Sequence, residues 1–330
     1  MNVCSSWSGD FMNIWQIVTP EKEYEIEIAN KTLLYQQHLE WHKLTRHINS
    51  YFNERNSEVE IFEDGVPLNK KDWNCYFIPY DVNIQLTKVT ANSPLKDIQY
   101  DLTEQLIYSP LFQELSEIWE QLNEELEYAN KKLSEWNIQA YLNEINEKFI
   151  GQLIQFRSTT GTDLSPIDVK SLLLNIIQEK RFDKKTLIII ELPELFASIK
   201  EVENFLNLVD EAVAKGYRFV FISDDKDFGV TNYMYKQKVI NKAVLSQIKS
   251  KVCNEVPFHC PDQMFEHAKT IFLQLVDNSI SEDELIDRCG NQFGAIVTIL
   301  NVMLYNLDME PILVPQGLEP HLKKFIASLR

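Results

Sequence analysis

Two strongly apolar segments lie between Lys184 and Asp225, and they read Thr186-Leu187-Ile188-Ile189-Ile190-Glu191 and Tyr217-Arg218-Phe219-Val220-Phe221-Ile222-Ser223. Such continuous apolar runs, without alternation, are typical of strands that are covered by helices on both faces. From Leu195 to Val213, apolar residues recur at three- and four-residue steps, which predicts an amphipathic helix that ends before Gly216. Together the three elements predict a β-α-β unit with a right-handed crossover in a mainly parallel sheet.

Acidic residues stand at the ends of both predicted strands, namely Glu191 after the first and Asp224 and Asp225 after the second. In open α/β sheets, ligands usually bind beyond the carboxyl ends of the strands. An acid in this place corresponds to the Walker B position of a P-loop NTPase. The phosphate loop of such a protein also needs the pattern Gly-x-x-x-x-Gly-Lys-Ser/Thr, because only glycine lets backbone amides wrap the phosphates closely.

The nearest candidate for a phosphate loop is Asn30-Lys31-Thr32, which follows the alternating strand predicted over residues 24–28. We expect this candidate to open a helix that carries Leu33, Leu34, Trp41, Leu44 and Ile48. Lys31 and Thr32 fit the motif, but its glycines are missing, and Glu25 stands where the first would be. Three acids crowd the approach and would repel a triphosphate: Glu23, Glu25 and Glu27.

Two interpretations of this region remain open. The sequence favours an NTPase-like scaffold that has lost its nucleotide loop and needs no cofactor. The alternative is a nucleotide-binding switch or NTPase with a degenerate P-loop. In that case Lys31 and Thr32 would contact phosphate, and Glu191 would act as a base or magnesium ligand.

Composition and cysteine count restrict the class of protein. The chain has 330 residues, of which 45% are hydrophobic and 25% charged, as in ordinary globular proteins. No apolar run approaches about 20 residues and the N-terminus lacks a signal pattern, so we expect a cytoplasmic protein without a membrane partner. Five cysteines, an odd number, argue against a disulfide framework. The cluster of Cys253, His259, Cys260 and His267 matches no familiar zinc spacing, which favours buried or idle thiols over a metal site.

Charge is distributed unevenly along the chain, whose formal net charge is −17. Between Asp227 and Glu255 there is no acidic residue, and we call this stretch the acid-free segment. It contains five lysines, which are our candidate DNA-binding residues: Lys236, Lys238, Lys242, Lys249 and Lys251. Helical periodicity from Val239 to Ile248 would place three of them on one outer face: Lys238, Lys242 and Lys249. A solvated lysine face is the alternative, but the absence of acids favours contact with the phosphates of a polyanion.

The middle of the chain predicts a long helical hairpin, which we call the leg. Apolar residues step by three or four from Leu111 to Trp136 and again from Tyr141 to Phe156, with a break at Asn137. Two such helices joined by a short connection favour an antiparallel pair, whose usual role is assembly. Six glutamates fill the gaps, and a solvated face is a better interpretation for them than a divalent-ion site: Glu114, Glu117, Glu120, Glu124, Glu125 and Glu127.

The predicted fold class is therefore α/β, with an NTPase-like head, an inserted leg and a C-terminal helical extension. We expect the head to comprise residues 1–93 and 160–258, with a Ser165-Pro166 helix start leading back into the first strand. The leg would comprise residues 94–159, and the extension residues 259–330.

This arrangement resembles the type II-A CRISPR adaptation proteins of the Csn-two family, and the C-terminal helices resemble those of its long subgroup. Three parts of the chain carry the resemblance: the strand–turn–strand–helix stretch Asn13 to Phe52, the leg, and the strand pair that starts at Lys184-Lys185 and ends at Ser223-Asp224-Asp225. These patterns consist of periodic apolar residues in a given order of elements, and they span most of residues 13–258.

The resemblance implies a function. Members of this family form tetrameric rings that take the ends of double-stranded DNA through a lysine-lined hole, without sequence preference or known catalysis. They act in spacer acquisition, an antiviral defence step, beside the CRISPR integrase pair and the effector nuclease. Calcium ions stabilise short members, whereas the break in this leg has no acidic cluster. The resemblance thus implies a non-enzymatic homotetramer that binds double-stranded DNA.

Overall fold

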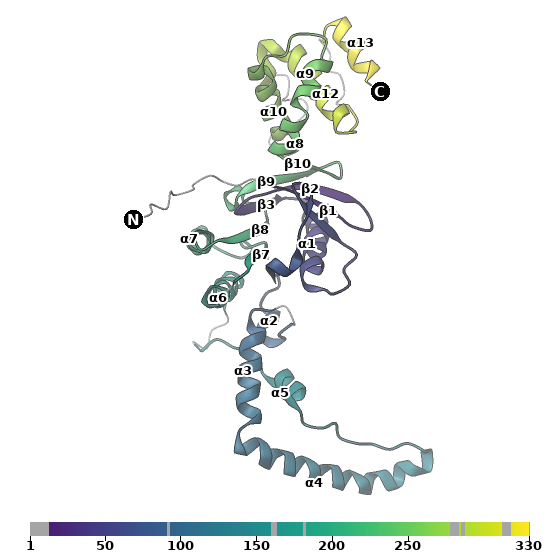
Figure 1. Cartoon of the computed structure of the whole chain (residues 1–330), viewed down its shortest axis with the longest axis vertical. Coiled ribbons are helices and arrows are strands. Elements are labelled where there is room, and N and C mark those ends of the chain that lie inside the picture. Colours follow the sequence, from purple (N-terminus) through teal and green to yellow (C-terminus); the bar gives the residue numbers. More distant parts are fainter. Residues whose placement is uncertain are drawn as a thin grey trace. The chain divides into compact units, whose positions relative to one another are not determined.

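The computed structural model describes residues 13–90, 93–159, 164–180, 183–277, 284, 288–311 and 318–329 (Figure 1). Contacts divide the chain into two compact units. The first unit comprises Met1–Cys75, Lys185–Leu187 and Lys215–Arg330, and the second comprises Tyr76–Lys184 and Ile188–Ala214.

The strands form two sheets. Their bounds are β1 (Asn13–Val18), β2 (Glu23–Ile28), β3 (Lys31–Tyr35), β4 (Glu60–Glu63), β5 (Val66–Pro67), β6 (Trp73–Ile78), β7 (Lys185–Glu191), β8 (Tyr217–Ser223), β9 (Val230–Tyr235) and β10 (Lys238–Ile240). The smaller sheet has the order β2-β1-β4-β5 and is antiparallel. The larger has the order β10-β9-β3-β8-β7-β6, and β3 is parallel to both β8 and β9. This confirms the predicted α/β class with a mostly parallel sheet.

The continuous apolar runs of the sequence became the central strands of the larger sheet. Every residue from Thr186 to Glu191 in β7 and from Phe219 to Ser223 in β8 is buried. The smaller sheet instead alternates, since Tyr24 and Ile26 of β2 are buried while Glu23 and Glu25 are exposed. Strands β7 and β8 and the first part of β2 thus follow the period of their apolar residues.

The described helices are α1 (His38–Asn53), α2 (Ile84–Thr87), α3 (Leu95–Ile107), α4 (Pro110–Leu133), α5 (Glu147–Leu153), α6 (Pro166–Glu179), α7 (Ile199–Ala214), α8 (Lys242–Gln247), α9 (Lys249–Glu255), α10 (Asp262–Val276), α12 (Phe293–Asn306) and α13 (Pro320–Ser328). The predicted start of α6 is confirmed, because the Ser165 side chain caps the amide of Asp168 and the Asp168 carboxylate caps Ser165 in return. None of the described helices is both long and apolar enough to cross a membrane.

The C-terminal helices share a hydrophobic core within the first unit. Figure 1 shows α10, α12 and α13 gathered with α8 and α9, next to the β9–β10 hairpin. Phe265, Phe272, Ile296 and Leu300 are fully buried in this core. The predicted all-helical character of the region therefore holds for its described residues.

Two predicted helix starts differ from the structure. Leu33 and Leu34 lie in strand β3 and not in a helix, and α1 begins only at His38. Both leucines are fully buried, and β3 is an interior strand paired with β8 on one side and β9 on the other. Helix α7 begins at Ile199, so Phe196 lies outside it, with a φ of 61° and an 83% exposed side chain.

The leg has one long helix where two were predicted. Helix α4 confirms the first arm, but residues 138–146 are extended and the second arm is helical only over α5. Side chains of α4 hold this return chain: the Asn130 side-chain amide both donates to the Ala140 carbonyl and accepts from the Ala140 amide, at 2.8 Å each. Trp119 donates to the Asn143 carbonyl at 2.8 Å. These bonds satisfy backbone groups that a second helix would have paired internally. Figure 1 shows the return chain leading back to α5.

Candidate functional site

The acid-free segment forms a β-hairpin followed by two short helices. Lys238 begins β10, Lys242 begins α8 and Lys249 begins α9, so the prediction that these three lysines share one helical face is wrong. The physical reason is the pairing of β10 with β9, in which Val239 lies opposite Met234. At the hairpin turn, Lys236 and Gln237 both adopt left-handed backbone angles, as a two-residue turn requires, and both are exposed.

Two of the five candidate lysines are paired with acids that come from the C-terminal region. Lys238 Nζ lies 3.3 Å from Asp308 and also donates to the Leu307 carbonyl. Lys249 Nζ lies 3.0 Å from Asp262 and 3.8 Å from Glu266. The hydrogen bond to Asp262 raises the pKa of Lys249. These pairs neutralise part of the positive charge of the acid-free segment.

The side chains of the other three candidate lysines are exposed to solvent. Lys236, Lys242 and Lys251 are exposed, and no acid lies within ion-pair distance of them in the described part of the chain. The Lys236 ammonium group stands over the Tyr235 ring, 5.5 Å from its centroid. The structure thus reduces the predicted group of five cations to three that can meet a phosphate without first breaking an ion pair.

The residues proposed as a degenerate phosphate loop do not stand at the start of a helix. Lys31 and Thr32 begin β3, and Thr32 is fully buried. Its hydroxyl accepts a hydrogen bond from the Ala29 amide at 2.9 Å. The connection from β3 to α1 consists of Gln36 and Gln37, both with positive φ and neither a glycine. A P-loop, by contrast, uses glycines to bring its backbone amides close to the phosphates.

Glu191, the acid at the Walker B position, is engaged within the second unit. It is 2% exposed, and its carboxylate accepts a hydrogen bond from the Tyr80 amide at 3.3 Å. Lys170 of α6 is fully buried and donates a hydrogen bond to the Leu192 carbonyl at 2.6 Å. Leu192 itself has a left-handed backbone conformation, with a φ of 43°. Burial lowers the pKa of Lys170 to about 8, against the opposing charges of Glu194 and Glu191. Lys170 was not predicted as a functional residue from the sequence, although the helical period of α6 places it among the buried positions.

Because the pKa of Lys170 is lowered, we expect the free energy of unfolding to depend on pH. In the unfolded chain Lys170 keeps its proton up to about pH 10.5, whereas in the folded chain it releases the proton from about pH 8. Because the unfolded state then binds more protons, the free energy of unfolding rises with pH between these values. The gain is up to about 3 kcal/mol across the interval. Urea unfolding of the wild type and of Lys170→Met from pH 7.5 to 10 should give a difference that changes in this direction. Parallel stability curves would show that Lys170 does not titrate in this range.

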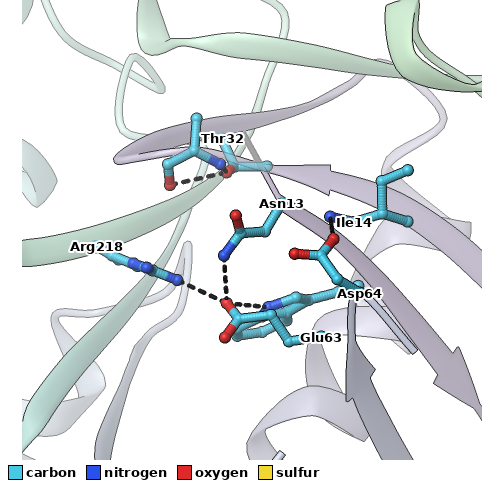
Figure 2. Close-up of polar contacts among 8 residues, drawn as sticks. Asn13, Ile14, Thr32, Glu63, Asp64 and Arg218 are labelled. Carbon is cyan, nitrogen blue, oxygen red and sulfur yellow. Dashed lines mark hydrogen bonds and ion pairs between the residues drawn. The ribbon is translucent and has the colours of Figure 1, made fainter. Parts of the chain in front are cut away.

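A second polar group missed by the sequence analysis joins the two sheets of the first unit. The Glu63 carboxylate accepts hydrogen bonds from Asn13 at 2.9 Å, Trp15 at 3.2 Å and Arg218 at 3.0 Å. Figure 2 shows Asn13 and Arg218 pointing toward this carboxylate. Burial alone would raise the pKa of Glu63, but the three hydrogen bonds together hold it below its ordinary value. Arg218 is therefore an internal structural cation, and we do not count it among the phosphate-binding residues.

The cysteine and histidine cluster contains one close contact. The Sγ atoms of Cys253 and Cys260 are 3.2 Å apart, and both thiols are half-buried. Within the described ranges, no three His, Cys, Asp or Glu side chains are placed to hold a metal ion, and this holds for the leg glutamates as well.

No family model matches the chain, and no curated protein matches it. Among solved structures, the chain is similar to Stu0660 of Streptococcus thermophilus, with 13% identity and a TM-score of 0.48 over 96% of this chain and 100% of that one. It is also similar to MJ1267, an ATP-binding cassette of an ABC transporter in its ADP conformation, with 15% identity and a TM-score of 0.36 over 69% and 90% of the two chains. CbiO1 of Clostridium perfringens, part of an ABC transporter complex, matches with 13% identity and a TM-score of 0.34 over 75% and 96%. Likenesses this distant assign no family.

Proposed function

We propose that this protein binds double-stranded DNA without sequence preference, engages its ends as a ring-shaped oligomer, and carries out no chemical step itself. The observation that carries the proposal is the set of exposed lysines Lys236, Lys242 and Lys251 in a segment without acids, within a chain whose net charge is −17. Flexible ammonium groups contact phosphates but read no bases, so such a surface favours binding without sequence preference.

The two paired lysines extend the same surface. Lys238 and Lys249 form ion pairs whose acids, Asp308 and Asp262, are 92% and 87% exposed. An exposed ion pair stabilises the fold by little, so a phosphate can replace the carboxylate at small cost. In the proposal, DNA therefore recruits all five lysines, three directly and two by exchange of partners.

The biological setting of the proposal is CRISPR spacer acquisition, beside the integrase pair and the effector nuclease. It is supported by the resemblance of the sequence to type II-A adaptation proteins. The proposed lack of catalysis is supported by the β3–α1 connection, which has no glycine, and by the engagement of Thr32 and Glu191 in internal hydrogen bonds.

We expect DNA retention to depend on the exposed lysines. The double variant Lys242→Glu plus Lys251→Glu should lose at least tenfold in affinity for a short linear duplex, because each reversed charge removes one phosphate contact and adds repulsion. For the wild type, three to five contacts per chain predict that log K falls with log salt with a slope of about −3 to −4.5. Fluorescence anisotropy between about 50 and 200 mM salt measures both quantities.

The matched control carries the same change of charge elsewhere in the first unit. Lys323 and Lys324 are exposed neighbours in α13, and Lys323→Glu plus Lys324→Glu should bind DNA as the wild type does. Equal losses in both double variants would reduce the effect to net charge and contradict the proposed surface. A closed circular duplex that competes as well as a linear one would remove the preference for ends.

The proposed ring would be assembled in part through the leg. None of the residues of α4 is buried, and its apolar stripe is open to solvent, with Leu111 72%, Leu122 43% and Ile118 53% exposed. An amphipathic helix of 24 residues that buries no side chain in its own chain suits contact with a second copy.

We expect the polar variant Leu115→Ser, Ile118→Ser, Leu122→Ser to lower the oligomeric state. Its measured mass in size-exclusion chromatography with light scattering should fall by at least half, while its circular dichroism stays close to that of the wild type. The control Glu117→Ser, Glu120→Ser, Glu124→Ser changes the polar residues of the same helix and should leave the mass unchanged. A monomeric wild type would exclude the ring.

A further inference from the structure

The second unit contains a cavity at the base of the leg that none of the functions above uses. Its volume is about 680 Å³, which lies within the range of small-molecule sites. Helix α3, helix α5 and the chain that follows α2 form its walls. The side chains that give it chemical character are Lys88, Lys96, Lys148, Tyr100, Gln152 and Glu147.

The lining of this cavity is positive, in contrast to the acidic chain. Three lysines and one glutamate give a net charge of +2 from the lining residues, whereas the whole chain carries −17. Lys96 donates to the neutral amide oxygen of Gln99 at 3.0 Å. In the described chain, no acid lies within ion-pair distance of Lys88, Lys96 or Lys148. Cations of one lining that have no carboxylate at ion-pair distance raise the local concentration of anions.

Buried polar groups fix the wall of the cavity. Gln99 is 5% exposed and donates to the Gly151 carbonyl at 2.8 Å, which ties α3 to α5. A Cβ atom at Gly151 would lie 3.4 Å from the Thr103 hydroxyl oxygen, an ordinary van der Waals contact, so the two helices are close together here. Thr103 is itself 2% exposed and donates to the Gln99 carbonyl at 2.6 Å. The site is therefore preformed, since its two helices are already joined.

The lining also contains one carboxylate, from Glu147, and one aromatic ring, from Tyr100. The carboxylate of Glu147 acts on the Tyr100 phenol and raises its pKa, with a smaller contribution from Glu104. A carboxylate can accept hydrogen bonds from ligand hydroxyl groups, an aromatic ring can stack on a base, and Gln152 can both donate and accept. Inorganic phosphate alone would leave most of this volume and these groups without a partner.

We propose that this cavity binds a nucleoside diphosphate, with Lys88, Lys96 and Lys148 on the phosphates and with Tyr100, Glu147 and Gln152 along the nucleoside. The lining shares no residue with the Lys31 and Thr32 region, and the proposed binding does not require DNA. The two phosphates of the ligand carry the negative charge that the three lysines attract. The nucleoside of the ligand matches the aromatic and hydrogen-bonding part of the lining.

Isothermal titration of the full chain with ADP, pyrophosphate and adenosine tests this proposal. ADP should bind more tightly than pyrophosphate or adenosine, because only ADP uses both parts of the lining. Lys88→Ala and Lys148→Ala should each weaken ADP binding by about tenfold, the usual value of a hydrogen bond to a charged group. The control Lys132→Ala removes an exposed lysine of α4 that does not line the cavity, and it should leave ADP binding unchanged.

Several outcomes would overturn the proposal. No heat of binding with ADP at millimolar concentration would remove the site, and so would unchanged affinity in both cavity variants. Pyrophosphate that binds as tightly as ADP would remove the nucleoside part. A short 5′-phosphorylated oligonucleotide that binds more tightly than ADP, with the same sensitivity to Lys88→Ala, would reassign the cavity to nucleic-acid ends. Since Lys242→Glu plus Lys251→Glu should leave ADP binding intact, failure here and failure of the DNA surface are distinguishable.

Discussion

Gly229→Ala is expected to destabilise the first unit by about 3–5 kcal/mol, enough to remove much of the stability of an ordinary domain. Gly229 stands immediately before β9 with a φ of 138°, a conformation that L side chains rarely adopt. A Cβ atom there would lie 2.3 Å from the carbonyl oxygen of Lys31 and 2.6 Å from its carbonyl carbon. Because these are backbone atoms of the neighbouring strand β3, the clash is relieved only by moving one strand away from the other.

Gly65→Ala and Gly216→Ala are the matched controls for this substitution. Their φ angles are 80° and 92°, but nothing lies within 4 Å of the added Cβ. They should therefore cost only the backbone strain, about 1–2 kcal/mol. Urea unfolding followed by tryptophan fluorescence gives all three values. If the loss at Gly229 equals that of the controls, the contact with Lys31 has no energetic importance and the strands can separate without cost.

Asn232→Leu is expected to cost about 4 kcal/mol, because it leaves several buried polar groups without partners. The Asn232 side-chain amide donates to the Glu27 carbonyl at 2.9 Å and accepts from the Glu27 amide at 2.8 Å. It thus takes the place of a neighbouring peptide group along β2, which is an edge strand of the smaller sheet. Asn241 adds a third bond by donating to the Asn232 side-chain oxygen at 2.9 Å. Leucine keeps the branched shape and the number of side-chain heavy atoms, so the loss would be mainly polar, with a smaller steric part from its bulkier methyl groups.

Two further variants separate this explanation from a packing effect. Asn232→Asp keeps the shape and the acceptors but loses the donor and adds a buried charge, so it should be about as damaging as leucine. Asn254→Leu changes an exposed asparagine of α9 and should alter the free energy of unfolding by less than about 0.5 kcal/mol. Chemical denaturation at neutral pH measures each variant. A small effect of both Asn232 variants would mean that water replaces the amide and that the two sheets are joined mainly by apolar contacts.

Elements whose signal is local were predicted well. The buried strands β7 and β8 were read from unbroken apolar runs, which need no knowledge of the neighbouring strands. Helix α4 followed from its apolar period, and α6 from the helix start at Ser165-Pro166. In each case, the residues that decide the structure lie within one segment.

Elements that depend on distant partners were predicted less well. The segment Lys31–Tyr35 shares apolar spacing with the helix that follows, and it is a strand because β8 and β9 flank it on both sides. The return chain of the leg is extended because Asn130 and Trp119 of α4 bond its backbone. Its sequence alone favoured a helix, since side-chain bonds to backbone are not visible in apolar periodicity.

The candidate lysines show the same division. The sequence by itself determined that Lys236, Lys238, Lys242, Lys249 and Lys251 lie in a stretch without acids, because this is a property of composition. Only the tertiary structure decided that Lys238 meets Asp308 and Lys249 meets Asp262, and that Lys88, Lys96 and Lys148 line one cavity. The reason is physical: apolar period and capping act over a few residues along the chain, whereas ion pairs and cavities depend on distances through space that only the packed fold fixes.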